Sequence, residues 1–305
     1  MTAKTHAITG AYSYTGKYTT RRLLDQGHKV ITLTGKPVSA SPFGGQVPPY
    51  PFNFDHPEKL AETLSGVDTL FNTYWVRYNH GEATYAKAIE NTRTLFRAAK
   101  QAGVRRIVHV SIANPSADSP LPYYAGKAAL EADLQALGVS YAILRPTVIF
   151  GREDILINNI AWFLRRFPVF GMPGRGEYRL QPIFVEDMAA LAVTAGERTA
   201  NEIIDATGPE TFTFRELLEM IQETIGIRRA LVPMPPMLAY LATQAVGAFL
   251  GDVILTREEV KGLMDDLLAT DSPPAGETRL SEWAAAHKDS LGKVYANEVR
   301  RHFSR

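Results

Sequence analysis

Short apolar runs alternate with stretches of helical periodicity through the first half of the chain. Residues 6–11 and 28–34 are apolar runs of strand length, and the segment between them has helical spacing and ends at Gly27. The same alternation continues, with strands expected at 68–74, 105–111 and 140–150 and helices at 88–103 and 123–138. Strands separated by helices predict a Rossmann-like, doubly wound α/β fold with a parallel sheet covered on both faces.

Two kinds of segment interrupt or follow this alternation. Residues 37–51 are rich in proline, glycine and serine and predict a surface loop. After residue 150 the pattern becomes mainly helical, with a glycine-rich loop at 171–176 and helical sequence as far as Arg305. The predicted division is therefore a dinucleotide-binding core of residues 1–150, to which 182–207 return, and a smaller, mostly helical substrate lobe of residues 151–181 and 208–305.

Residues 237–255 form the longest apolar stretch of the chain. Gln244, Asp252 and two glycines interrupt the stretch, and prolines crowd its start, so a buried or partner-facing helix is favoured over an integral membrane span. A role at a membrane surface is left open.

Composition excludes several classes of function. The 305 residues carry a net charge of about +1, which gives no reason to expect a nucleic-acid partner. There are no cysteines, and the seven histidines are scattered without ligand spacing, so no metal site is expected. No signal-peptide pattern follows Met1, and a cytoplasmic location is expected.

The segment ITGAYSYTG places Gly10 and Gly16 between the first predicted strand and helix. Gly10 suits a sharp turn, Gly16 suits close packing of the helix on the sheet, and both lie where a dinucleotide pyrophosphate meets a helix N-terminus. Ser13 stands where a third glycine is usual, and its hydroxyl could contact a phosphate oxygen. Two glycines alone also occur in purely structural turns.

Tyr123 and Lys127 are four residues apart and therefore share one face of a helix. A nearby ammonium lowers the pKa of a tyrosine, which allows proton transfer near neutral pH. Ser111 ends the preceding strand, where its hydroxyl could hold a substrate carbonyl. Alternatively, the tyrosine and lysine form an ordinary solvated face, and Ser111 caps a turn.

These motifs together resemble the short-chain dehydrogenase/reductase superfamily, in particular its extended and atypical branches. TGAYSYTG is similar to the TGxxGxxG turn except at Ser13, YYAGK matches YxxxK, and LRPTVIFG is similar to LRPxxxYG, which implies Pro146 beside the nicotinamide. Within the superfamily, the chain is similar to bacterial relatives of the NADPH-binding accessory subunit of respiratory complex I. The resemblance implies that Tyr123 exchanges a proton with the substrate, Lys127 binds the ribose, and Asn91 holds a relay water.

The end of the second strand bears on the choice of cofactor. Residues 27–53 contain no Asp or Glu, while Thr34 and Lys36 follow the strand, so NADP(H) is preferred over NAD(H). Asp55 could meet the adenine edge or cap a helix. The predicted cofactor contacts are Gly10, Tyr12, Ser13, Tyr14, Thr15, Gly16, Thr34, Lys36, Asp55, Asn72, Thr73, Lys127 and Pro146.

Two functions follow from these residues. The first is an NADP(H)-dependent oxidoreductase acting on a small carbonyl, alcohol, enone or quinone-like substrate, with Tyr74 and Trp75 lining the substrate pocket or simply packing in the core. The second is a non-catalytic NADPH-binding protein with a structural or redox-sensing role, in which a protein partner or a homo-oligomer is expected.

Overall fold

The computed structural model describes residues 2–299, and the chain divides into two compact units. Unit 1 contains the chain up to Pro146 together with Val185–Ala206, and unit 2 contains Thr147–Phe184 and the chain from Thr207 onward. Of the helical sequence expected as far as Arg305, residues 300–305 lie outside the described residues.

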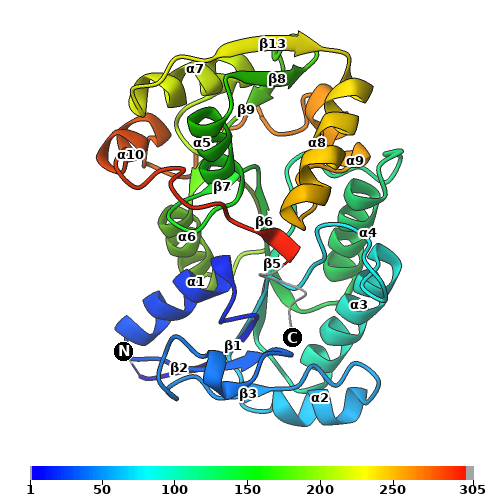
Figure 1. The fold of residues 1–305 in the computed structure, drawn as a ribbon. Coiled ribbons are helices and arrows are strands. Elements are labelled where there is room, and N and C mark those ends of the chain that lie inside the picture. The colour runs from blue at the N-terminus through cyan, green and yellow to red at the C-terminus, as the bar shows by residue number, and fades with distance from the viewer. Residues whose placement is uncertain (1, 300–305) are drawn as a thin grey trace. The chain divides into compact units, whose positions relative to one another are not determined.

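A seven-stranded parallel sheet forms the centre of unit 1, in the order β11-β6-β5-β4-β1-β2-β3 (Figure 1). Its strands are β1 (Thr5–Thr9), β2 (Lys29–Leu33), β3 (Pro49–Tyr50), β4 (Thr69–Asn72), β5 (Arg106–Val110), β6 (Ser140–Pro146) and β11 (Glu202–Ala206). Apart from the edge strands β3 and β11, the strands have apolar, buried centres, as expected of a parallel sheet that is covered on both faces. The predicted Rossmann-like α/β fold is confirmed.

Helices cover both faces of this sheet (Figure 1). The helices of unit 1 are α1 (Tyr14–Asp25), α2 (Pro57–Thr63), α3 (Tyr85–Gln101), α4 (Pro122–Ala136) and α6 (Val185–Glu197). Helices α1 and α6 pack together on one face, while α2, α3 and α4 pack side by side on the other. The chain leaves β1 toward β2 on one side, and β4 lies on the other side, so the switch point of the topology is between β1 and β4.

Part of the expected surface loop at 37–51 has regular structure, so that prediction was incomplete. It contains the 3₁₀ turn Val38–Ala40 and the two-residue strand β3, which pairs with β2 at the edge of the sheet. Pro49 is tolerated in β3 because an edge strand can leave one side of its backbone without a ladder partner.

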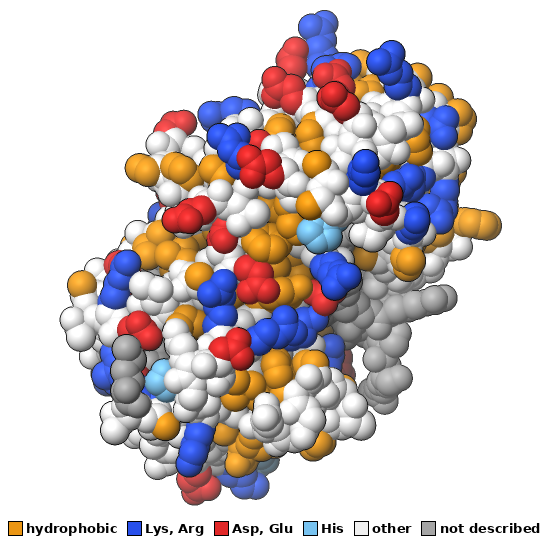
Figure 2. Space-filling view, turned by 90° about the vertical axis from the view of Figure 1, so that its left-hand side faces the viewer, with side chains coloured by type: hydrophobic (Ala, Val, Ile, Leu, Met, Phe, Trp, Pro, Cys, Tyr) orange, Lys and Arg blue, Asp and Glu red, His pale blue; other side chains and the backbone are white. Residues whose placement is uncertain are grey.

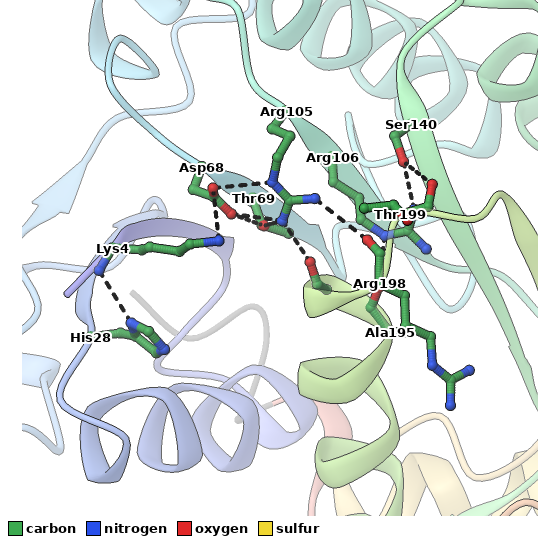
Figure 3. A network of polar contacts seen from close by, with 11 residues as sticks. Lys4, His28, Asp68, Thr69, Arg105, Arg106, Ser140, Ala195, Arg198 and Thr199 are labelled. Atoms are coloured by element: carbon green, nitrogen blue, oxygen red, sulfur yellow. Dashed lines mark hydrogen bonds and ion pairs between the residues drawn. The ribbon is translucent and has the colours of Figure 1, made fainter. Parts of the chain in front are cut away.

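Arginine side chains join the returning segment of unit 1 to the amino-terminal ends of the strands of the sheet (Figure 3). Arg106 is fully buried and donates to the carbonyl of Ala195 (2.7 Å), to Ser140 Oγ (2.5 Å) and to the carbonyl of Ala200 (2.9 Å). Its neighbour Arg105 forms an ion pair of 2.8 Å with Asp68. The starts of three strands and the end of α6 are thereby joined.

Unit 2 has its own apolar core, built around Phe150, Leu217 and Trp283. Three two-stranded sheets accompany its helices: β7 (Ile149–Phe150) with β10 (Ile183–Phe184), β9 (Arg179–Leu180) with β12 (Phe212–Thr213), and β8 (Val169–Pro173) with β13 (Ala230–Met234). Its helices are α5 (Leu156–Arg166), α7 (Phe214–Thr224), α8 (Pro236–Leu250), α9 (Arg257–Met264) and α10 (Leu280–Ala286).

Two local expectations for unit 2 were wrong. The expected glycine-rich loop at 171–176 begins inside strand β8, and the sequence after residue 226 is not continuously helical, because β13 precedes α8. Both strands gain their backbone partners only by pairing with each other across about 60 residues, which local periodicity does not reveal.

Helix α8 accounts for most of the apolar stretch at 237–255. It contains no charged residue and leaves Leu238, Leu241 and Phe249 exposed, with Phe249 89% accessible. Among the described residues, no helix is both long and apolar enough to cross a membrane. Figure 2 shows one face of the molecule, on which acidic and basic side chains are interspersed.

Candidate functional site

The turn between β1 and α1 has the backbone geometry that its glycines predict. Gly10 has φ of 70°, a left-handed conformation that favours glycine. Ser13 precedes α1 in an extended conformation, its hydroxyl makes no cap hydrogen bond, and the first turn of α1 carries no acidic side chain. The helix N-terminus therefore offers backbone N–H groups and a positive dipole end that suit a phosphate.

A row of hydrogen bonds crosses the switch point just below the carboxyl ends of the strands. Thr9 on β1 donates through Oγ1 to Asn72 Oδ1 (3.1 Å), and Asn72 Nδ2 donates to Nδ1 of His109 (3.0 Å). The backbone N–H groups of Thr73 and Tyr74 donate to Thr9 Oγ1 and Asn72 Oδ1, at 2.7 and 3.1 Å. Asn72 is fully buried, so its side chain fixes the loop after β4, and Thr73 lies at the start of that loop.

The directions of these hydrogen bonds fix the state of His109. Because Asn72 Oδ1 accepts two hydrogen bonds, its Nδ2 is the donor, and His109 Nδ1 must be an unprotonated acceptor. Burial lowers the pKa of His109 well below its ordinary value, and the nearby charge of Lys127 lowers it further. His109 is therefore a neutral ring within the sheet.

Helix α4 places Tyr123 and Lys127 on consecutive turns of one face. Lys127 is 2% exposed, and its ammonium donates to the carbonyl of Val110 at the end of β5 (2.9 Å). Burial lowers the pKa of Lys127 to about 7, opposed by the charge of Glu131 one turn further along α4. Lys127 is thus a desolvated cation and not part of an ordinary solvated helix face.

Trp75 touches both of these residues. The Lys127 ammonium lies over the indole ring, 4.4 Å from its centroid, and the Tyr123 ring meets the indole edge-on at 5.6 Å. The indole also stacks with Tyr85, with ring centroids 6.1 Å apart and an interplanar angle of 15°. Trp75 therefore lies against both members of the predicted catalytic pair.

The two other predicted catalytic residues, Ser111 and Asn91, are both buried. Ser111 follows Val110, the carbonyl partner of Lys127, and is 3% exposed, and its Oγ has no hydrogen-bond partner among the described residues. Asn91 on α3 is also buried, and its Nδ2 donates to the hydroxyl of Tyr74 (2.8 Å). The loop after β4 is therefore held from α3 as well as from β1.

The residues expected at the adenosine end are more dispersed. Thr34 is buried after β2, its Oγ1 accepts from the backbone N–H of Lys36 (3.1 Å), and Lys36 is half-buried. Tyr12 donates from its hydroxyl to the carbonyl of Val47 (2.6 Å). Asp55 is exposed and lines, with Asn91, a depression of about 400 Å³ between the β3–α2 connection and α3.

The remaining predicted cofactor contacts are Tyr14, Thr15 and Pro146. Tyr14 and Thr15 form the first turn of α1, and Tyr14 meets the ring of Tyr18 edge-on at 5.9 Å. Pro146 is buried at the carboxyl end of β6, where its carbonyl accepts from the backbone N–H of Ala113 (2.9 Å).

Sequence reasoning missed Glu131, which lies one turn after Lys127 on α4 and interacts with its charge. Glu131 is buried and forms a bidentate ion pair with Arg145 of β6, with a shortest distance of 2.6 Å. The spacing of Tyr123, Lys127 and Glu131 by four residues each could have indicated this third member, whereas Arg145 is brought in only by the sheet. Within residues 2–299 there is no cluster of three metal-ligating side chains.

Comparison with known proteins agrees with this geometry. The model of a family described as NAD(P)H-binding matches residues 10–155. The chain is 26% identical over 230 residues to a mitochondrial NADH dehydrogenase (ubiquinone) 1 alpha subcomplex subunit 9 of Arabidopsis thaliana, covering 72% of this chain and 57% of that protein. It is also 26% identical over 253 residues to a farnesyl-dihydroquinoline-oxide ketoreductase of Stigmatella aurantiaca, covering 75% of each chain.

Among solved structures, the NADPH-dependent quinone oxidoreductase of Escherichia coli in complex with NADPH superposes with a TM-score of 0.74, at 21% identity, over 92% of this chain and 99% of that one. The resemblance drawn from the sequence is therefore confirmed. Residues 10–155 carry an NAD(P)H-binding domain, and the chain is similar in sequence to atypical short-chain dehydrogenase/reductase proteins and shares their fold. The chain spans only 49–63% of the length of the mitochondrial NADH dehydrogenase subunits that it matches.

Proposed function

We propose that the protein is an NADP(H)-dependent oxidoreductase that reduces a small carbonyl, enone or quinone-like group, or oxidises the corresponding alcohol. One observation carries this proposal: Lys127, on the same face of α4 as Tyr123, reaches the carbonyl of Val110, next to the buried and unpartnered hydroxyl of Ser111. The end of β5 thus has a buried cation next to a hydroxyl, and α4 carries a tyrosine one turn before that cation, which supports general acid–base catalysis by these groups.

The cofactor is proposed to lie across the switch point, with its pyrophosphate over Gly10, Ser13 and Gly16. Gly10 leaves the turn open, and the N-terminus of α1 has no acidic side chain that would compete with a phosphate. NADP(H) is preferred because Lys36 follows β2 and no carboxylate occurs in residues 27–53. When bound, this cofactor supplies the hydride.

In the proposed reduction, the substrate carbonyl carbon gains the hydride and its oxygen gains a proton from the Tyr123 hydroxyl, which gives an alcohol and oxidised cofactor. Ser111 would donate a hydrogen bond to the same oxygen and fix its position. Lys127 would hydrogen-bond the ribose and favour the phenolate left on Tyr123. Asn91 is proposed to support a relay water. Its Nδ2 also donates a hydrogen bond to the hydroxyl of Tyr74.

The proposed substrate is planar or apolar. Trp75 and Tyr74 lie in the loop after β4, and the rings of Trp75, Tyr85 and Tyr123 are in mutual contact. Aromatic side chains of this kind suit flat, apolar ligands. The names of two similar proteins, a quinone oxidoreductase and a ketoreductase acting on a ring ketone, support the same choice.

A second candidate is a non-catalytic NADPH-binding protein with a protein partner. The names of several relatives, which are subunits of NADH dehydrogenase, favour it, as do the exposed apolar residues of α8. A second copy of this chain could equally cover the exposed apolar residues of α8. A cytoplasmic location remains a prediction, and these relatives are described as mitochondrial.

The experiment that separates the two candidates is a binding and turnover screen of the purified protein. Thermal shift with NADPH and NADH tests the cofactor, and NADPH oxidation over a panel of carbonyls, enones and quinones tests catalysis. Tight NADPH binding together with Tyr123-dependent turnover supports the enzyme. Tight binding without any such turnover favours the structural or sensing role.

A further inference from the structure

The side chain of Lys127 has three kinds of neighbour in unit 1. Its ammonium donates to the carbonyl of Val110, lies over the face of the Trp75 indole at 4.4 Å, and interacts electrostatically with Glu131. The charge of Glu131 is shared with Arg145, which contacts both of its carboxylate oxygens. The contact with the indole face is therefore one of the main interactions that offset the free-energy cost of removing the Lys127 ammonium from water.

The indole is held in place independently of Lys127. The two residues before it are fixed by backbone hydrogen bonds to Thr9 and Asn72, and Tyr85 stacks on the ring. A Cβ placed on Gly126 would lie 3.2 Å from Cη2 of Trp75, so the indole packs closely against the backbone of α4. The ring thus has a fixed position against which the flexible lysine can be placed.

We propose that Trp75 is a positioning residue for Lys127: its indole face holds the buried ammonium in the charged form, at the end of β5 and beside Tyr123. The cation–π contact itself is independent of the cofactor, whereas its value for the reaction rests on the proposed function of Tyr123 and Lys127. Trp75 is thereby given a role that is separate from lining a substrate pocket.

The expected effect on titration has a definite sign. Burial disfavours the ammonium and lowers the pKa of Lys127 to about 7, while Glu131 and the indole oppose that effect. Among the other groups around it, His109 is held neutral, Arg145 is engaged by Glu131, and the rings of Tyr123 and Tyr85 pack against the indole. Weakening the π face should therefore lower the pKa of Lys127 further.

The test replaces tryptophan by fluorotryptophans carrying one, two or three ring fluorines, which weaken the π face and hardly change its shape. The protein, free of cofactor, is labelled with ¹³C at lysine Cε, and the Lys127 resonance is assigned by its loss in Lys127→Met. The titration midpoint of Lys127 should fall progressively, by roughly 0.5 to 1 pH unit across the series. A midpoint that stays constant across the series would overturn the proposal.

The matched control is the same series in a Trp75→Phe background. There the fluorines remain only on Trp162 and Trp283, and Trp162 has its own cation contact, with Arg166 at 4.4 Å. The Lys127 midpoint should not respond to fluorination in this background, and an equal response would also overturn the proposal. Since no cofactor or substrate is present, failure of the protein to bind NADPH would remove the proposed function and leave this result unaffected.

Discussion

A Cβ atom placed on Gly16 would lie 2.3 Å from the carbonyl oxygen of Gly10. Helix α1 therefore packs directly on the turn that precedes it, and any side chain at position 16 must force the turn open. This relationship explains why glycine is required for the structure of the turn over which the cofactor pyrophosphate is proposed to lie.

Gly16→Ala should accordingly abolish NADPH binding, because the contact is with backbone and cannot be relieved by a rotamer change. Isothermal titration of the folded variant with NADPH checks this. Gly103→Ala provides the control: its φ of 73° imposes left-handed strain of about 1–2 kcal/mol at the end of α3, with no atom within 4 Å of the new Cβ. It should lose stability and keep wild-type affinity, and NADPH affinity retained in Gly16→Ala would refute the site.

Cofactor selectivity should depend on Lys36. Lys36→Glu is expected to weaken NADPH relative to NADH by about one to two decades in Kd, because it replaces a charge-assisted contact to the 2′-phosphate by repulsion. The ratio of the two dissociation constants measures this. Lys29→Glu makes the same charge change at the exposed opposite end of β2 and should leave the ratio unaltered. A wild-type preference for NADH would contradict the assignment.

Acid stability should depend on His6. Burial is the main cause that lowers the pKa of His6 from 6.5 to about 4. Between these pH values His6 is neutral in the folded protein and protonated in the unfolded chain. Its contribution to stability is present above pH 6.5 and is lost as the pH falls toward 4, by about 1.4 kcal/mol per pH unit.

The variant His6→Phe tests this account, since a phenyl ring keeps the edge contacts with Phe71 and cannot take up a proton. Urea unfolding at pH 7 and pH 5 should show a smaller decrease in stability for His6→Phe than for the wild type. Equal decreases would mean that His6 is not the residue responsible.

Arg106 should make a large contribution to the free energy of unfolding through its contacts at the amino-terminal ends of the strands. Arg106→Met removes the donor to the carbonyls of Ala195 and Ala200 and leaves the Glu202 carboxylate with Arg198 as its partner, at a cost of about 3–5 kcal/mol in the free energy of unfolding. Chemical denaturation measures it. Arg93→Met, which breaks a half-exposed pair with Asp133, should cost less than about 1 kcal/mol, and similar costs for both variants would contradict the argument.

The sequence was most informative where local pattern and structure coincide. The alternation of strands and helices defined the sheet, and Thr213 and Glu216, three residues apart, form a capping box at the start of α7. The spacing of Tyr123 and Lys127 also placed both on one face of α4. These features depend on residues close together in the chain, where periodicity and capping preferences act directly.

Features made by distant residues were not accessible in the same way. The pairing of β8 with β13 and the ion pair between Glu131 and Arg145 join residues whose proximity only the fold creates. Trp75 was predicted as pocket lining or core packing, and neither reading included its contact with the Lys127 ammonium. The burial that lowers the pKa of Lys127 likewise depends on packing from several elements.

The central claim is tested most directly by NADPH oxidation in wild type and Tyr123→Phe across a panel of carbonyls, enones and quinones. Tyr123→Phe should bind NADPH normally and lose turnover by roughly a hundredfold or more, because only the proton-donating hydroxyl is removed. Tyr141→Phe, at the amino-terminal end of β6, should behave as wild type. Turnover unchanged in Tyr123→Phe, or no turnover of any substrate by a wild type that binds NADPH tightly, would contradict the oxidoreductase assignment.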